Sequence, residues 1–289
     1  MPQMKRIVVC MKWGTLFNAT YVNVLFNAVK AHCHSLDEFI CITEDATGIH
    51  PDVKIQPIPD MPIDASYYAA GAWPKLGLFK RGVLPENSRV LFIDLDMMIC
   101  GSLERFFDVG DEFHACGGST WGAPPKKSRP FLYEAYKRRR EENKQIRKAL
   151  TAESLGFKDN PVPPNTMGSQ IFAFDGNGLT NVYDRFTNDP IRARALHTNE
   201  QHFLERSLPL WKPWPTGWVI HYKYNLRQPL IQDIFKHPSP PPPTASVVSF
   251  SGRPRPHELS ESLTSSLKEF PHMRFGRVKW FKKYWNMQN

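Results

Sequence analysis

The chain has 289 residues, a hydrophobic fraction of 41% and a formal net charge of +9. This length allows one large α/β domain or two small ones with a sizeable buried core, and the composition excludes a largely disordered chain. The excess of Lys and Arg favours an anionic partner, such as a nucleotide diphosphate, a nucleic acid or an acidic membrane surface.

The first predicted elements form a strand–helix–strand unit. Residues 6–11 are a short β-branched run typical of a buried parallel strand, residues 18–34 repeat apolar positions at helical spacing, and residues 38–45 are a second apolar run. A further helix is predicted at about 73–82. Residues 88–99 (SRVLFIDLDMMI) are predicted as one strand, whose apolar run stops at two acids. Together these elements indicate a Rossmann-like half sheet.

The second half of the chain alternates predicted helices, loops and strands. In chain order we expect an exposed helix at 131–150, a Pro-rich loop at 160–165, a strand at 169–175, helical pieces at 182–186 and 199–206, an aromatic-rich loop at 213–225, a stiff extended loop at 237–243, a strand at 246–252 and a basic-aromatic tail at 274–285.

The cysteines and the apolar runs indicate the expected compartment. The chain has five cysteines: Cys10, Cys33, Cys41, Cys100 and Cys116. Their odd number and the lack of a CxxC pair predict neither a disulfide framework nor a zinc ribbon. The apolar run near the start is too short for a signal peptide, and no stretch approaches the roughly eighteen apolar residues of a membrane span. A reducing cytoplasm is therefore expected.

The strongest chemical signal is Asp94-Leu95-Asp96 after the apolar run at 90–93. Alternate residues of an extended segment point the same way, so both carboxylates can face one site at the carboxyl end of a strand, where ligands bind in open α/β sheets. Paired carboxylates suit Mg²⁺ or Mn²⁺ with open positions for diphosphate oxygens. The alternative is a pair of solvated loop acids, and the position after a buried strand favours the metal site.

With these residues the chain resembles the GT-A-fold glycosyltransferases, nearest to glycosyltransferase family 8 and its bacterial relatives. The resemblance runs from about residue 7 to residue 258 and is closest at 73–103 (WPKLGLFKRGVLPENSRVLFIDLDMMICGSL). It implies an α/β fold, namely a single GT-A (Rossmann-like) domain with a central mixed, mostly parallel sheet flanked by helices.

The expected domain boundaries follow from this resemblance. The GT-A domain is expected to cover 1–260, with the nucleotide-binding half at about 1–110 and the acceptor and donor-sugar half at about 111–260. A basic-aromatic C-terminal tail at 261–289 is expected to follow it.

The resemblance also implies the site residues. Asp94 and Asp96 take the metal position, with Ser251 where the family supplies a third ligand, and Glu200 and Gln201 take the catalytic position near the anomeric carbon. The residues placed at the nucleotide-sugar donor are Lys12, Tyr21, Thr43, Lys75, Asp94, Ser169, Gln170, Gly252, Arg253 and Arg255. Physical chemistry supports a divalent ion with fixed basic side chains, because the nucleoside diphosphate leaves only when its negative charge is neutralised.

The chain departs from the family pattern at four positions. Ser251 stands in place of a histidine metal ligand, Gly168 in place of an asparagine, Gln170 in place of a glycine and Glu200 in place of an aspartate. His221 and His257 are alternative candidates for the third ligand. These departures leave the identity of the sugar open.

The implied function is metal-dependent transfer of a sugar from a nucleotide-sugar donor, UDP-linked, to a glycan or lipid-linked acceptor in glycoconjugate or polysaccharide assembly. The resemblance implies Mn²⁺ or Mg²⁺ and retention of the anomeric configuration. Glu200 or Gln201 would then stabilise the oxocarbenium-like transition state or position the sugar. An inverting enzyme would instead use Glu200 or Asp175 as the base that activates the acceptor.

Three other functions are weighed against this one. A sugar nucleotidyltransferase usually has a Gly-rich phosphate loop after the first strand, and residues 12–18 (KWGTLFN) lack one. A non-catalytic nucleotide-sugar or glycan-binding protein of the same fold is kept open by the departures at 168 and 251. Nucleic-acid binding ranks last, since no recognised module is visible. The tail at 274–285 fits either peripheral contact with an anionic membrane surface or a helix with a core stripe.

Overall fold

The computed structural model describes residues 4–65, 68, 71–117, 120, 167–176, 178–197, 199–228, 232, 236–250, 252, 254–259 and 278–285. The helix expected at 131–150 and the loop expected at 160–165 lie outside these residues.

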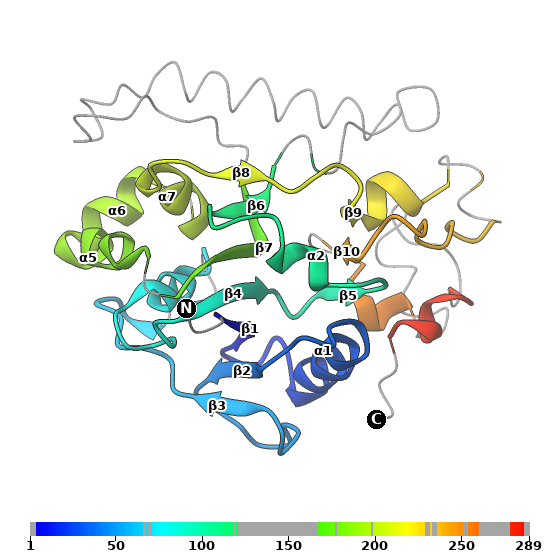
Figure 1. Cartoon of the computed structure of the whole chain (residues 1–289), viewed down its shortest axis with the longest axis horizontal. Helices are drawn as coiled ribbons and strands as arrows, with labels where there is room; N and C mark the ends of the chain where they lie inside the picture. Colours follow the sequence, from blue (N-terminus) through cyan, green and yellow to red (C-terminus); the bar gives the residue numbers. More distant parts are fainter. Residues whose placement is uncertain are drawn as a thin grey trace.

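A seven-stranded sheet forms the centre of the described chain (Figure 1). Its strands, in spatial order, are β3 (Lys54–Gln56), β2 (Glu38–Thr43), β1 (Lys5–Lys12), β4 (Ser88–Ile93), β7 (Gly168–Asp175), β6 (His114–Cys116) and β8 (Lys212–Pro213). All neighbouring pairs are parallel except those of β7, which runs antiparallel to both β4 and β6. The expected mixed, mostly parallel sheet is therefore confirmed.

Side chains of the central strands alternate between two buried clusters, as the period of two in a strand requires. Ile7 and Val9 face a cluster with Trp73, whereas Val8 and Cys10 face a cluster with Leu25. Helix α1 (Ala19–His32) belongs to the second cluster; the short helix at Trp73–Phe79 and helices α5 (Thr180–Asn188) and α7 (Glu200–Ser207) belong to the first. The sheet is thus covered on both faces, which accounts for its continuous apolar runs.

The single strand expected at 88–99 is a wrong prediction. Strand β4 ends at Ile93, and β5 (Met97–Ile99) joins a separate three-stranded sheet in the order β5-β10-β9, with β10 at Val247–Ser249 and β9 at Val219–His221. The backbone N–H of Met97 donates to the carbonyl of Asp94 (3.3 Å), so a turn separates the two strands. Both strands are buried along their whole length, and the apolar residues 90–93 and 97–99 are separated by only three positions, so the hydrophobic pattern alone could not separate them.

Three other elements differ from expectation. The segment at 73–82 is a 3-10 helix that ends at Phe79. Helix α6 (Pro190–Leu196) was not predicted. The loop expected at 213–225 contains β9 and a π-helix at Tyr222–Leu226. The strand, helix and loop predictions at 169–175, 182–186, 199–206 and 237–243 are confirmed.

The described part of the basic-aromatic tail, 278–285, packs onto the protein. Phe281 and Trp285 are 0% and 2% exposed, and both belong to the cluster that contains α1. The ring of Trp285 lies edge-on to Tyr21, with centroids 5.3 Å apart. These two aromatic residues therefore form core, as the core-stripe interpretation expected, although the only helical part of 278–285 is a 3-10 helix at Phe281–Lys283. No helix in the described ranges is long and apolar enough to cross a membrane.

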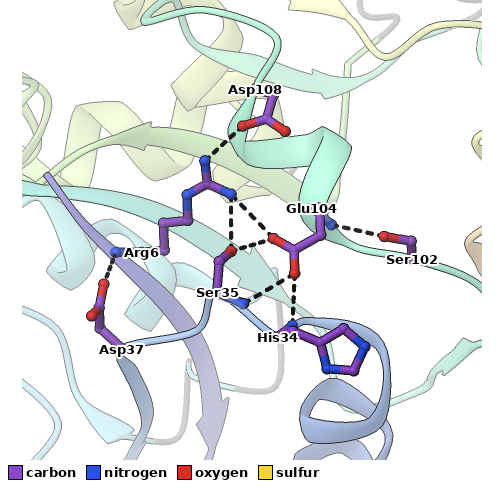
Figure 2. Close-up of polar contacts among 7 residues, drawn as sticks. All are labelled: Arg6, His34, Ser35, Asp37, Ser102, Glu104 and Asp108. Atoms are coloured by element: carbon purple, nitrogen blue, oxygen red, sulfur yellow. Dashed lines mark hydrogen bonds and ion pairs between the residues drawn. The ribbon is translucent and has the colours of Figure 1, made fainter. Parts of the chain in front are cut away.

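A polar network lies at the amino-terminal end of β1 (Figure 2). Asp94 follows β4, which is parallel to β1, and therefore lies at the opposite end of these strands. The carboxylate of Glu104, at the start of helix α2 (Glu104–Phe107), accepts hydrogen bonds from the backbone N–H groups of His34 (2.6 Å) and Ser35 (3.0 Å), from the Ser35 hydroxyl and from the Arg6 guanidinium (3.1 Å). Arg6 also pairs with Asp108 at 2.7 Å. This network ties β1, the end of α1 and α2 together.

Replacing Glu104 tests the contribution of this network. Partial burial would raise the pKa of the Glu104 carboxyl, but the donors of Ser35 and His34 and the Arg6 guanidinium together lower it. A lowered pKa in the folded chain means that the stabilisation is fully present above the ordinary pKa and is lost as the pH falls through the folded-state pKa. We expect Glu104→Ala to reduce the free energy of unfolding by about 1–3 kcal/mol at pH 7, and by less at pH 3.5, in urea denaturation.

Glu86 provides the control for this measurement, because it is an exposed glutamate in a turn. Glu86→Ala should change stability by less than about 0.5 kcal/mol. A pH-independent loss in Glu104→Ala would contradict the role of the charged carboxylate.

Candidate active site at the end of strand β4

Lys75 lies at the centre of a buried group of charges. Its side chain extends from the 3-10 helix at Trp73–Phe79, and its Nζ lies 2.8 Å from both carboxylate oxygens of Asp94 and 3.6 Å from Oε1 of Glu200. The same ammonium donates to the carbonyl of Ser169 (3.3 Å) and lies 5.1 Å from the centre of the Phe92 ring. Four elements that are far apart in sequence therefore meet at this one side chain.

Burial and ion pairing have opposite effects on the charged forms of this group. Burial alone would lower the pKa of Lys75, but Asp94 and Glu200 raise it above its ordinary value, so the ammonium stays charged. Burial raises the pKa of Asp94, and Lys75 opposes that rise. For Asp96, burial and the neighbouring Asp94 raise the pKa to about 7. One lysine therefore does not compensate all the negative charge at the end of β4.

Glu200 begins helix α7 and is only 3% exposed. Its carboxylate accepts a hydrogen bond from the Ser169 hydroxyl, and its backbone N–H donates to the carbonyl of Gly71 (2.9 Å). Burial raises its pKa, while Lys75 and Ser169 oppose that rise. A carboxylate in the first turn also interacts favourably with the helix dipole. Glu200 is thus held in one orientation beside Lys75, and the half-buried Gln201 follows it on the helix.

Lys12 and Thr43 meet at the carboxyl ends of β1 and β2. They are paired in the parallel ladder, and both are 4% exposed. The Lys12 ammonium donates to the backbone carbonyl of Asp45 (3.0 Å) and lies 3.4 Å from its carboxylate, while the Thr43 hydroxyl donates to the same carbonyl (3.0 Å). The backbone N–H of Gly14 donates to Glu44 (2.7 Å). This corner lies at the same end of the sheet as Asp94, where nucleotides bind in Rossmann-like folds.

Tyr21 connects this end of the sheet to the C-terminal segment. Its hydroxyl is hydrogen-bonded to Nδ1 of His257, and the Arg255 guanidinium lies 5.3 Å from the centre of the Phe17 ring. Burial raises the pKa of Tyr21, the charge of Arg255 lowers it, and the charge of Asp96 raises it further. Arg255 also lowers the pKa of Asp96. The structure therefore brings Tyr21, Arg255 and Asp96 into one electrostatic neighbourhood.

The structure brings some of the expected site residues together in two groups. Lys75, Asp94, Ser169 and Glu200 form one connected group, and Lys12 with Thr43 forms a second at the same end of the sheet. Ser251 and Arg253 lie outside the described residues. Gly252 has φ +72°, the left-handed conformation that glycine adopts without strain. The contact of Phe17 with Arg255 was missed, because no local pattern indicates that residues 238 positions apart will meet.

The carboxylates suit a divalent cation in charge and in chemistry. Burial raises the pKa of Asp94, and burial together with the charge of Asp94 raises that of Asp96, so a bound hard cation would favour the charged form of both. Within the described residues no three His, Cys, Asp or Glu side chains form a group able to hold a metal ion. His221 and His257 are therefore not brought to these acids as further ligands: Nδ1 of His221 accepts the backbone N–H of Lys223, and that of His257 contacts Tyr21. Of the described side chains, a metal site here would use Asp94 and Asp96, together with bound oxygens of the substrate or solvent.

Comparison with known proteins places this arrangement in a structural context. No family model and no curated protein matches the chain. An active-site mutant of LgtC aligns over 86% of this chain and 89% of its own length, with a TM-score of 0.54 and 12% identity. The galactosyltransferase LgtC in complex with donor and acceptor sugar analogues aligns over 86% of this chain and 88% of its own, with a TM-score of 0.50 and 12% identity.

A third structure gives the same result. The glycosyltransferase GlyE of Streptococcus pneumoniae TIGR4 aligns over 98% of this chain, which covers 62% of GlyE, with a TM-score of 0.52 and 10% identity. At such low identity these likenesses establish the fold. The α/β fold expected from the sequence is confirmed, and this chain has the GT-A-like fold of these glycosyltransferases.

Proposed function

We propose that this chain is a glycosyltransferase that takes a sugar from a UDP-linked donor and passes it to a glycan or lipid-linked acceptor. The observation that carries the proposal is the buried Lys75, held between Asp94 and Glu200 at the carboxyl end of β4. LgtC, whose fold this chain shares, was solved with donor and acceptor sugar analogues. That likeness supports a donor and an acceptor as the two binding partners.

Each charged side chain has a defined task in this proposal. Lys75 and Arg255 bind the diphosphate, and Lys12 and Thr43 shape the nucleoside end of the site. Asp94 and Asp96 would hold Mn²⁺ or Mg²⁺, with Ser251 as a further oxygen ligand, and the bound ion would supply positive charge to the leaving diphosphate. Arg253 and Gly252 would complete the phosphate contacts, since a glycine allows close approach of the backbone.

Glu200 would act on the sugar by charge and position. Its carboxylate is buried and already engaged by Ser169 and Lys75, and this favours a fixed negative charge near the anomeric carbon over a base that reaches out to an acceptor. Gln201, next on the helix, would hold the sugar. Such a charge stabilises an oxocarbenium-like transition state, so the proposal includes retention of the anomeric configuration.

The test is an incubation of the purified chain with UDP- and GDP-sugars, with Mn²⁺ or with EDTA, while nucleotide release is measured. Release of UDP from one donor, lost in EDTA and restored by Mn²⁺, is the expected result. UDP binding without release from any donor would favour the non-catalytic binding protein of the same fold. Absence of both binding and release would refute the proposed function.

A further inference from the structure

Gln170 lies directly opposite Asp94 in the central sheet. Strands β4 and β7 pair antiparallel through Ile93 and Ile171, and the ladder continues with a hydrogen bond from the backbone N–H of Asp94 to the carbonyl of Gln170 (2.8 Å). Residues directly opposed in such a ladder project their side chains from the same face. The carboxamide of Gln170 therefore extends from the face that carries Asp94.

This carboxamide has a buried atom that nothing satisfies. Oε1 of Gln170 is shielded from solvent and has no hydrogen-bond partner in the part of the chain that the structure describes. A buried oxygen without a partner has lost its hydrogen bonds to water and gained none in return. Other buried atoms among the described residues share this state, for example Ser249 Oγ and Trp285 Nε1. Gln170 differs from them in its position opposite Asp94, where a bound ligand would supply the missing hydrogen bond.

The neighbouring groups restrict which ligand this can be. Lys75 is engaged with Asp94 and Glu200, and the Ser169 hydroxyl donates to Glu200. The amide of Gln170 is neutral, so it adds no charge for a phosphate or a metal ion. A hydroxyl group can donate and accept, and it therefore satisfies an amide whichever of its two ends faces the ligand. The complementary ligand is a polyhydroxyl compound.

We propose that the Gln170 carboxamide binds one ring hydroxyl of the donor sugar and selects donors in which that hydroxyl is free. This inference rests on the proposed function and adds to it a substrate class: nucleotide-linked sugars that carry an unsubstituted hydroxyl at the position facing Gln170. Donors that lack the hydroxyl, or that carry a bulky group there, leave the buried amide unpaired and bind more weakly.

Calorimetric binding measurements on wild type and Gln170→Leu test this proposal. In wild type, UDP-sugar should bind more tightly than UDP. Gln170→Leu should retain UDP affinity within about twofold but lose about tenfold in affinity for the preferred UDP-sugar. Leucine cannot form the hydrogen bond to the sugar, and the variant has no unpaired amide for the sugar to satisfy. Because leucine removes an unpaired polar group, the ligand-free variant should also melt at a temperature no lower than wild type.

Two further arms identify the interaction. Deoxyfluoro analogues of the preferred UDP-sugar each lack one hydroxyl. One of them should bind wild type about tenfold more weakly than the parent UDP-sugar does. The same analogue should bind Gln170→Leu as tightly as the parent UDP-sugar binds that variant. Gln56→Leu, the same substitution on β3 at the far edge of the sheet, is the control and should leave all affinities unchanged.

The outcomes separate this inference from the function on which it rests. If wild type prefers UDP-sugar to UDP and Gln170→Leu keeps the same preference, the role of Gln170 is refuted while the transferase function stands. If wild type binds neither UDP nor any UDP-sugar, both are refuted.

Discussion

Lys75→Met is expected to destabilise the protein and to slow donor turnover strongly. The side chain of Lys75 is buried between the partly exposed Asp94 and the buried Glu200, so methionine leaves both carboxylates without their counter-ion. Removing one partner from a buried ion pair costs about 3–5 kcal/mol. Because the proposed function assigns this ammonium to the leaving diphosphate, we expect release of UDP to fall by about 10²–10³-fold. Urea denaturation and UDP release measure the two effects.

Two companion variants determine whether buried charge is the cause. Lys54→Met makes the same change at a half-exposed lysine that pairs with Glu38 (2.7 Å), and it should cost at most about 1 kcal/mol. The double variant Lys75→Met with Glu200→Gln should be less destabilised than the sum of the single variants, because it removes one uncompensated carboxylate. If Lys75→Met is as stable as Lys54→Met, the buried charge group at the end of β4 is wrongly described.

Local patterns predicted only part of the charge group, namely the acids that follow β4. Asp94 and Asp96 could be found because they interrupt a fully apolar run, and an apolar run that ends in acids marks the ligand end of a buried strand. The pairing of Lys75 with Asp94 and Glu200 depends on a 3-10 helix, a strand and the first turn of α7 converging. Only the family resemblance indicated these residues, since no spacing in the sequence encodes that convergence.

The errors have a common cause. Strand β5 continues the apolar run of β4, and β9 lies within an aromatic-rich segment that resembles a loop. Both strands are short and form their ladders with β10, which is more than 140 residues away from β5 and about 25 residues from β9. Periodicity reports the burial of a segment and not its partner, so the second sheet could not be predicted. In the tail, burial of Phe281 and Trp285 likewise depends on distant partners.

Asp96→Asn is expected to affect metal binding and stability in opposite directions. In the folded chain, burial and Asp94 hold the pKa of Asp96 above its ordinary value, so its charged form is disfavoured by the fold at neutral pH. Asparagine has the same shape without the charge. The ligand-free variant should therefore be at least as stable as wild type in urea denaturation, as is typical when a functional charge is removed from a crowded site.

Metal binding should change in the other direction. Loss of one of two carboxylate ligands should weaken Mn²⁺ binding in the presence of UDP by at least about tenfold, measured from the electron paramagnetic resonance signal of free Mn²⁺. Nucleotide release that depends on Mn²⁺ should be lost with it. Asp52→Asn, which removes a surface carboxylate that lies 3.5 Å from Lys30, is the matched control and should alter neither property. Unchanged Mn²⁺ affinity in Asp96→Asn would place the metal elsewhere. Weaker Mn²⁺ binding with unimpaired stability would show that the Asp96 carboxylate serves metal binding and does not stabilise the folded chain.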